Sequence, residues 1–328
     1  MSCTPESAAR RAFMAAMVIG ALAATTSSLA QVGEKAVRIV LPNATGSGVD
    51  TITRTVQPAL AKALGMAVVI ENQPGAGGIV GVQTLTRAVP DGMTLGVVSN
   101  NVVIFPSVYK TLPFELPADL TPIAIVGFTP VVLVVNPKVP AKTAKELAAL
   151  MKSKNGDFNY GSSGNGTILH LAAEMFVDEA GAKAKHIPYK GVGPMLTDLI
   201  GGQVEMATAA LPSVQSHLKS GALRAIGVGA AQRVPAAPDI PTMTEQGIPM
   251  DLTGYFSLLA PAGVPKPILD QLAKWNNEVV ALPETKAFLN KFASDPWINA
   301  MDDAQGYFLK DIANWANYIR IAKIEPQG

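Results

Sequence analysis

Val37-Arg38-Ile39-Val40-Leu41 leads into the loop Thr45-Gly46-Ser47-Gly48, a helical stretch over 51–64 and the strand-like run Val68-Val69-Ile70. The same plan returns as Phe158-Asn159-Tyr160, the loop Ser162-Ser163-Gly164-Asn165-Gly166-Thr167, a helical stretch over 168–180 and a strand near 185–189. Each copy places a turn of small residues directly before a helix, where unpaired backbone N–H groups and the positive end of the helix dipole favour an anion. Two such turns predict two lobes that hold one carboxylate ligand between them.

The composition is that of an ordinary globular chain long enough for two domains. Of its 328 residues, 48% are apolar and 16% are charged, and 26 Lys and Arg against 25 Asp and Glu give a net charge of +1. So balanced a charge excludes attraction of nucleic acid or of an anionic membrane surface by bulk electrostatics. We therefore expect binding specificity to come from a local site.

The first 30 residues have the pattern of an export signal. Arg10 and Arg11 precede the apolar run 12–24, and the small-residue exit Ser28-Leu29-Ala30 predicts cleavage near Ala30. Sec export and twin-arginine export both fit this pattern, and both predict a periplasmic protein. Cys3 is the only cysteine and lies in this segment, so the mature chain has no thiol for a disulfide, a metal site or catalysis.

Strand-like and helical runs alternate along the chain, which predicts an α/β fold of mostly parallel sheets flanked by helices. Beyond the repeats, the expected strands cover 94–99, 123–126, 131–135, 204–208 and 223–228, and the expected helices cover 79–87, 144–154, 194–201, 267–281 and 305–323. The last two helices have no strands of their own, so we assign them to the first lobe. With crossings near 129–135 and 254–259, lobe 1 comprises 31–131 and 255–328, and lobe 2 comprises 132–254.

The first loop also resembles a dinucleotide fingerprint, because Gly46 and Gly48 lie between a strand and a helix and Glu71 follows the next strand. Thr51 replaces the third glycine of that fingerprint, which argues against a nucleotide cofactor. A plainer alternative is a tight turn in which Asp50 caps the helix.

Residues for catalysis are few. His170, His186 and His217 are the only histidines, and the sequence contains no nucleophile elbow, zinc-protease motif or phosphate-loop lysine. His170 and Glu174 are one helical turn apart and could form half of a metal site, but the sequence offers no evident third ligand. We therefore expect no enzymatic activity, no cofactor and no metal.

Longer motifs give the chain a family resemblance. They are Val69-Ile70-Glu71-Asn72-Gln73-Pro74-Gly75-Ala76-Gly77-Gly78, Val89-Pro90-Asp91-Gly92-Met93-Thr94-Leu95, the second loop with His170-Leu171-Ala172-Ala173-Glu174, Pro188-Tyr189-Lys190-Gly191 and Ala260-Pro261-Ala262-Gly263. In these segments the chain resembles the periplasmic solute-binding proteins of tripartite tricarboxylate transporters, the Bug family. The resemblance implies a monomeric two-lobed clamshell of the type II periplasmic-binding-protein class, with two crossover strands at its hinge. Such a protein binds a small organic carboxylate and delivers it to a membrane permease.

The resemblance also implies ligand-binding residues that hold carboxylates through backbone amides, hydroxyls and water. Transferred by position, and with one serine added at the end of an expected strand, they are Thr45, Gly46, Ser47, Gly48, Asp50, Ser99, Ser162, Ser163, Asn165, Gly166, Thr167, Thr208, Ala209 and Tyr255. Relatives often carry an acidic residue after the strand 204–207, where this chain has Thr208-Ala209-Ala210. Its loss predicts a di- or tricarboxylate or an aromatic acid as the ligand, rather than an amino acid.

Two other functions remain open at this point. A receptor of the same shape could report its ligand to a sensor protein instead of a permease. An exported enzyme could bind a dinucleotide across the first loop.

Overall fold

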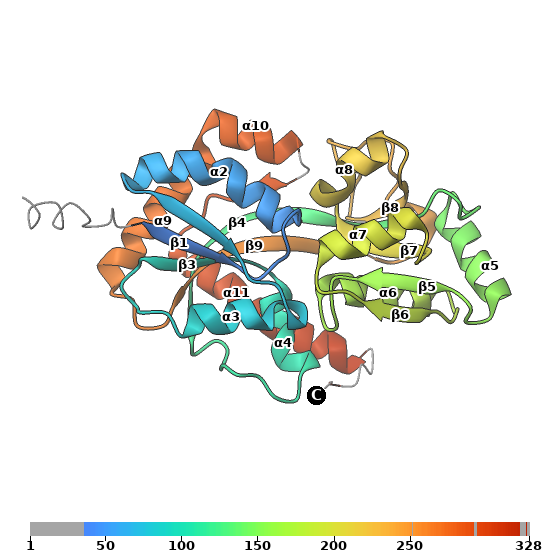
Figure 1. Ribbon diagram of the computed structural model, residues 1–328, viewed down its shortest axis with the longest axis horizontal. Coiled ribbons are helices and arrows are strands. Elements are labelled where there is room, and N and C mark those ends of the chain that lie inside the picture. Colours follow the sequence, from blue (N-terminus) through green and yellow to red (C-terminus); the bar gives the residue numbers. More distant parts are fainter. Residues whose placement is uncertain (1–35, 251, 292–293, 322–325, 327–328) are drawn as a thin grey trace, which may run out of the picture. The chain divides into compact units, whose positions relative to one another are not determined.

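The computed structural model describes residues 36–250, 252–291, 294–321 and 326 (Figure 1). The predicted export signal over 1–30 lies outside the described residues. Within these ranges, no helix combines the length and the apolar character of a membrane span.

One half of the sheet is built from the first strands of the chain. β1 (Val37–Leu41) lies between β2 (Val68–Asn72) and β3 (Thr94–Ser99), and all three are parallel. β9 (Thr253–Pro261) runs antiparallel beside β3 and pairs with the first part of β4 (Leu120–Val135), while the short strand β10 (Asp295–Pro296) also pairs with β4. Because β1 and β3 are parallel neighbours, the residues that follow them meet at one edge of the sheet.

The second half is arranged around the last five residues of β4. Residues 131–135 pair with both β7 (Met206–Ala210) and β8 (Arg224–Gly229). β5 (Asn159–Ser162) lies parallel to β7, and β6 (Lys185–Pro188) lies parallel to β5. The residues after β5 and β7 are therefore also brought to a common edge.

β4 joins the two halves as one strand of 16 residues, where the sequence predicted two strands over 123–126 and 131–135. The strand continues because its residues up to Pro130 pair with β9 and the following ones take new partners in β7 and β8. Leu252, directly before β9, accepts a hydrogen bond from the Val131 N–H and donates one to the Gly229 carbonyl. The chain thus passes between the half-sheets at two neighbouring points.

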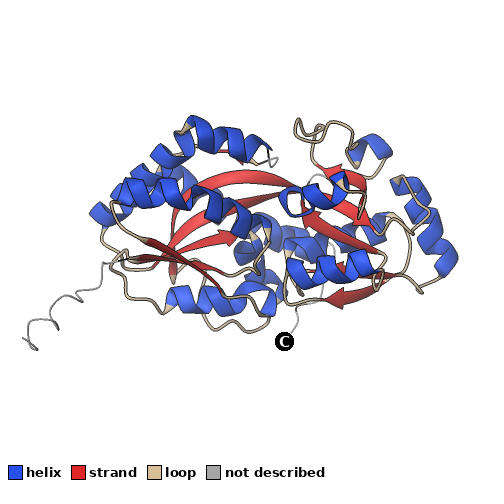
Figure 2. Cartoon of the chain, turned by 45° about the horizontal axis from the view of Figure 1, so that its top comes forward, coloured by secondary structure: helices blue, strands red, loops and turns tan. Residues whose placement is uncertain are grey.

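Helices cover both faces of the sheet (Figure 2). In the described residues the α-helices are α2 (Gly48–Leu64), α3 (Ile79–Thr86), α4 (Asn101–Val108), α5 (Ala144–Lys154), α6 (Ile168–Glu179), α7 (Val192–Gly201), α8 (Leu211–Lys219), α9 (Lys266–Ala281), α10 (Pro283–Lys291) and α11 (Met301–Ile321). The described residues also contain two short 3₁₀ helices, η1 (Ala76–Gly78) and η2 (Thr244–Gln246). The sequence prediction missed α4, α8 and α10.

The two repeated loops end in the same kind of helix cap. The Ser47 hydroxyl accepts a hydrogen bond from the Asp50 N–H, so α2 begins at Gly48, three residues earlier than predicted. The Thr167 hydroxyl accepts from the His170 N–H in the same way at the start of α6. Each cap satisfies one N–H of the first turn and leaves others directed beyond the helix end.

The C-terminal helices pack on the first half-sheet and on the strand that joins the halves. α9 contacts α2 and β4, and α11 contacts α4 and β4. Phe308 and Trp315 of α11 are buried, and burial of each such ring stabilises the fold by roughly 1.5–3 kcal/mol. This packing fixes α4, whose N-terminus forms part of the site described next.

Candidate functional site

A small cavity of about 50 Å³ lies where the ends of β1 and β3 face the ends of β5 and β7. Residues from both half-sheets form its wall: Asn43, Ser47, Gly48, Val49, Ser99, Asn100, Asn101, Thr129, Val131, Ser163, Ile168, Leu169, Val192, Ala210, Ser213, Gly254, Tyr255 and Phe256. No Asp, Glu, Lys, Arg or His is among these described residues, so the wall consists only of neutral groups.

Five helices begin at this cavity. The wall contains first-turn residues of α2, α4, α6, α7 and α8, namely Gly48, Asn101, Ile168, Val192 and Ser213. The N-terminus of a helix carries about half a positive charge and unpaired N–H groups. Converging helix starts therefore give a neutral wall a positive potential that suits an anion.

Four side-chain atoms in the wall are buried and have no hydrogen-bond partner among the described residues. They are the Oδ1 atoms of Asn43 and Asn100 and the hydroxyls of Thr129 and Ser213. Asn100, Thr129 and Ser213 are only 1%, 2% and 8% exposed. A buried polar group without a partner costs roughly 1–3 kcal/mol, so a polar ligand in the cavity would relieve this cost.

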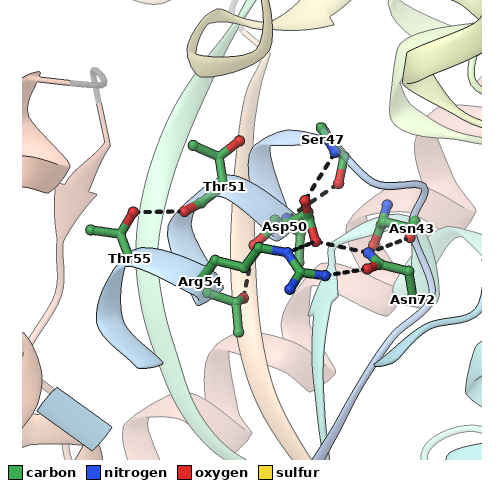
Figure 3. Close-up of polar contacts among 10 residues, drawn as sticks. Asn43, Ser47, Asp50, Thr51, Arg54, Thr55 and Asn72 are labelled. Carbon is green, nitrogen blue, oxygen red and sulfur yellow. Dashed lines mark hydrogen bonds and ion pairs between the residues drawn. The ribbon is translucent and has the colours of Figure 1, made fainter. Parts of the chain in front are cut away.

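The first loop is held by a polar network around Asp50 (Figure 3). The buried Asp50 carboxylate accepts hydrogen bonds from the Gly46 N–H at 2.9 Å, from Arg54 Nε at 2.8 Å and from Asn72 Nδ2 at 2.9 Å. Asn72 also donates to the Asn43 carbonyl and accepts from Arg54. Asp50 is thus neutralised inside the fold and positions the loop, and it does not line the cavity.

The second loop is held by hydrogen bonds to two histidines. Ser162 Oγ lies 2.6 Å from His186 Nε2, and the Gly166 N–H donates to His170 Nδ1 at 3.2 Å. The two imidazole rings are stacked, with centroids 4.0 Å apart. Burial, and then the neighbouring His170, lower the pKa of His186 to about 4. His186 is therefore neutral near pH 7, which suits its contact with a serine hydroxyl.

Glu174 lies next to this pair, with Oε1 3.6 Å from His170 Nε2. It also accepts a hydrogen bond from the Tyr160 hydroxyl. His170, with its bond to Glu174, lowers the pKa of this carboxyl, against the effect of burial. Among the described residues, no group of three His, Cys, Asp or Glu side chains is placed to hold a metal ion.

Contacts between the two halves bring the loops together. Tyr109, at the end of α4, donates its hydroxyl hydrogen to the Asn165 carbonyl at 2.7 Å, and Asn101 Oδ1 accepts from the Ile168 N–H at 2.9 Å. A Cβ atom added to Gly191 would lie 2.6 Å from the Ala44 Cβ. Only a glycine fits at such a distance. The cavity is therefore enclosed by direct contact between the halves.

The structure brings five of the predicted ligand-binding residues to the cavity wall: Ser47, Gly48, Ser99, Ser163 and Tyr255. The other nine do not line it: Thr45, Gly46, Asp50, Ser162, Asn165, Gly166, Thr167, Thr208 and Ala209. The Thr208 hydroxyl, for example, donates to the Leu169 carbonyl and is fully buried. Ligand contact by any of the predicted residues stays a prediction.

Several wall residues were missed by the sequence analysis, above all Asn100, Thr129 and Ser213. Asn100 directly follows β3, and ligands of parallel sheets bind beyond the carboxyl ends of the strands, so this position carried a usable signal. Ser213 lies in the first turn of a helix that was not predicted. Thr129 lies inside a strand and carried no signal of its own.

Comparison with known proteins places this arrangement in a family. Residues 52–324 match the model of the tripartite tricarboxylate transporter family receptor. Protein BugT of Bordetella pertussis is 32% identical over 314 residues, which cover 92% of this chain and 95% of BugT.

Solved structures of the same type superpose over most of the chain. The periplasmic binding protein BugD is 30% identical, with a TM-score of 0.85, over 89% of this chain and 99% of BugD. Rpa4515 of R. palustris with adipate is 26% identical, with a TM-score of 0.86, over 89% of this chain and 98% of the other. MatC from Rhodopseudomonas palustris with bound malate is 27% identical, with a TM-score of 0.82, over 86% and 98%. These neighbours confirm the predicted two-lobed fold.

Proposed function

Because the chain belongs to the tripartite tricarboxylate transporter receptor family, a family of solute-binding receptors and not of enzymes, we propose that it captures a small dicarboxylate in the cavity between its two halves. It then delivers this ligand to a membrane permease of the tripartite tricarboxylate type. One observation carries the proposal: among the described residues, a wall without charged side chains, at which five helices begin, holds two buried hydroxyls, of Thr129 and Ser213, that have no partner and can donate to a carboxylate.

The chemistry of the wall suits a carboxylate. Backbone N–H groups and hydroxyls donate hydrogen bonds to an anion, and each charge-assisted bond contributes roughly 1.5–3 kcal/mol. About four to six such bonds, set against several kcal/mol for association, give micromolar affinity, near −8 kcal/mol. No arginine or lysine is needed for this sum.

The ligand has an apolar middle and polar ends. Val131, Ile168, Leu169 and Phe256 add aliphatic and aromatic surface to the wall between its polar residues. Two related proteins are described with adipate and with malate, which are both dicarboxylates. Since no acidic side chain among the described residues lines the cavity, a ligand ammonium group would find no charged partner there, and amino acids are disfavoured.

Closure couples binding to transport. Ser47 and Asn43 come from the first half, whereas Ser163 and Ser213 come from the second, so only the closed form offers the whole set of contacts. A ligand that binds the closed form better shifts the population towards it. In this proposal the periplasmic monomer opens between residues 31–131 with 255–328 and residues 132–254, and the permease recognises the closed form.

A ligand screen tests the proposal. Thermal-shift and calorimetric titrations with malate, adipate, citrate, benzoate and glutamate should give the largest stabilisation with a dicarboxylate. Thr129→Val removes a buried hydroxyl at nearly constant volume and should weaken binding of that ligand. Thr55→Val, on the exposed side of α2, should leave its affinity unchanged. Tighter binding of glutamate than of every plain carboxylate would contradict the proposal.

A further inference from the structure

A second pocket, of about 320 Å³, lies between the start of β9, the beginning of α4 and helix α11. The residues that determine its chemistry are Asn100, Thr253, Tyr255, Tyr307, Asp311 and Trp315. Asn100 and Tyr255 also contribute to the wall of the first cavity, but the other four do not. The proposed carboxylate function makes no use of this pocket.

Asp311 gives the pocket a negative charge. Its Oδ2 accepts a hydrogen bond from the Tyr255 hydroxyl at 2.9 Å, and the Trp315 side chain is a second hydrogen-bond partner. Burial raises the pKa of Asp311, and these two bonds lower it again in part. Within the described ranges, no Lys, Arg or His forms an ion pair with this carboxylate. A half-buried carboxylate that has only neutral donors is stabilised by any cation that enters beside it.

Aromatic rings surround the carboxylate. The rings of Tyr255 and Tyr307 meet edge to face, with centroids 5.2 Å apart, and Trp315 is buried beside them in the pocket wall. Aromatic faces attract organic cations, tryptophan most strongly. A cation with an alkyl group would find both a charge partner and an apolar surface here.

Asn100 adds an unsatisfied acceptor. Its side chain is 1% exposed, and its Oδ1 has no hydrogen-bond partner among the described residues. A carboxylate, an amide oxygen and electron-rich rings together require a ligand that carries N–H donors and a positive charge. A hydrated metal ion fits less well, because Asp311 is the only acid in the described wall and calcium takes six to eight oxygen ligands.

We infer that this pocket is a second ligand site, which binds a small primary ammonium ion between Asp311, Asn100 and the rings of Tyr307 and Trp315. The N–H groups donate to the carboxylate and to the amide oxygen. The alkyl part lies against the aromatic rings. Its charge partner Asp311 and the rings of Tyr307 and Trp315 lie outside the wall of the first cavity, whereas Asn100 belongs to both walls.

The test uses n-butylammonium as the probe and n-butanol as its neutral counterpart, with ligand-observed NMR on the purified protein. The wild type should bind butylammonium saturably and should not bind butanol. Asp311→Asn keeps the shape and the acceptor for Tyr255 but removes the charge, and it should weaken binding at least tenfold. Asp303→Asn, an exposed acid on the same helix, is the matched control and should leave binding unchanged.

A second variant keeps the test decisive if Asp311→Asn unfolds. Tyr307→Leu retains apolar volume but removes the aromatic face. It should lower the affinity for butylammonium at least threefold, and butanol should remain unbound. Absence of saturable binding to the wild type would overturn the inference. Equal affinity in the wild type, Asp311→Asn and Tyr307→Leu would overturn it as well.

Discussion

Ser213→Ala should change stability and ligand affinity in opposite directions. Ser213 lies in the first turn of α8, is 8% exposed, and its hydroxyl has no partner among the described residues. Removal of a buried hydroxyl that makes no hydrogen bond recovers about 1 kcal/mol of desolvation, and Ala also favours the helix by a few tenths of a kcal/mol. The ligand-free variant should therefore melt about 2 °C higher than the wild type.

The same change should weaken ligand binding. If the Ser213 hydroxyl donates to a carboxylate oxygen, its loss removes roughly 1.5–3 kcal/mol, which is about 10- to 150-fold in Kd. Calorimetric titration with the best ligand of the screen measures this directly, and Ser216→Ala on the exposed side of α8 is the control. An affinity equal to that of the wild type would refute the reasoning that unpartnered wall groups bind the ligand.

Three further predictions concern the residues behind the wall. Asp50→Asn should lower the free energy of unfolding by about 1–3 kcal/mol in urea titrations and weaken ligand binding, because it removes the charge of a buried carboxylate that pairs with the half-exposed Arg54 and positions the first loop. The exposed control Asp270→Asn should change the free energy of unfolding by less than about 0.5 kcal/mol. Because the pKa of His186 is about 4 in the fold and about 6.5 when unfolded, the unfolded chain binds more protons between these values. The full shift corresponds to roughly 3 kcal/mol, and solvent screening of this partly exposed ring reduces it, so stability should fall by about 1 kcal/mol as pH drops from 6.5 to 4. His186→Gln should remove this pH dependence, and an unchanged profile would exclude His186 as its source. Gly191→Ala should reduce affinity at least tenfold by keeping the halves apart at Ala44, and small-angle scattering with ligand should then report the open form.

Much of the fold could be predicted because its elements carry local signals. β1, β3 and the repeated loops have apolar runs and capping hydroxyls that depend only on neighbours in sequence. α4 lacked such a signal: most of its eight residues are buried and apolar, so no polar face marks a helical period, and Pro106 interrupts it. α8 is short and begins with Leu211-Pro212, which reads as a turn.

These missed helices explain the missed part of the site. Ser213 lies in the first turn of the missed helix α8, so it could not be inferred without that helix. Asn100 directly precedes the missed helix α4, and its place after β3 was the only signal for it. The repeated loops were found, but the sequence could not tell a wall residue from one behind it. Ser162 and Ser163 are adjacent, yet only Ser163 lines the cavity, because Ser162 bonds to His186 on another strand. Such a contact depends on tertiary packing, so the neighbouring residues in the sequence do not indicate it.

The absence of charge from the described cavity wall has a consequence for release. A carboxylate held by an arginine keeps much of its attraction when a lobe moves away, since a charge pair decays slowly with distance. Hydrogen bonds from helix N-termini and hydroxyls depend on direction, and they are lost when donor and acceptor separate by only a few ångströms. When the seam between Ala44 and Gly191 separates, the donors of one half are lost together. A neutral wall therefore makes affinity a steep function of closure. In the proposed function, a permease that opens the two halves would by the same movement lower the affinity and release the ligand.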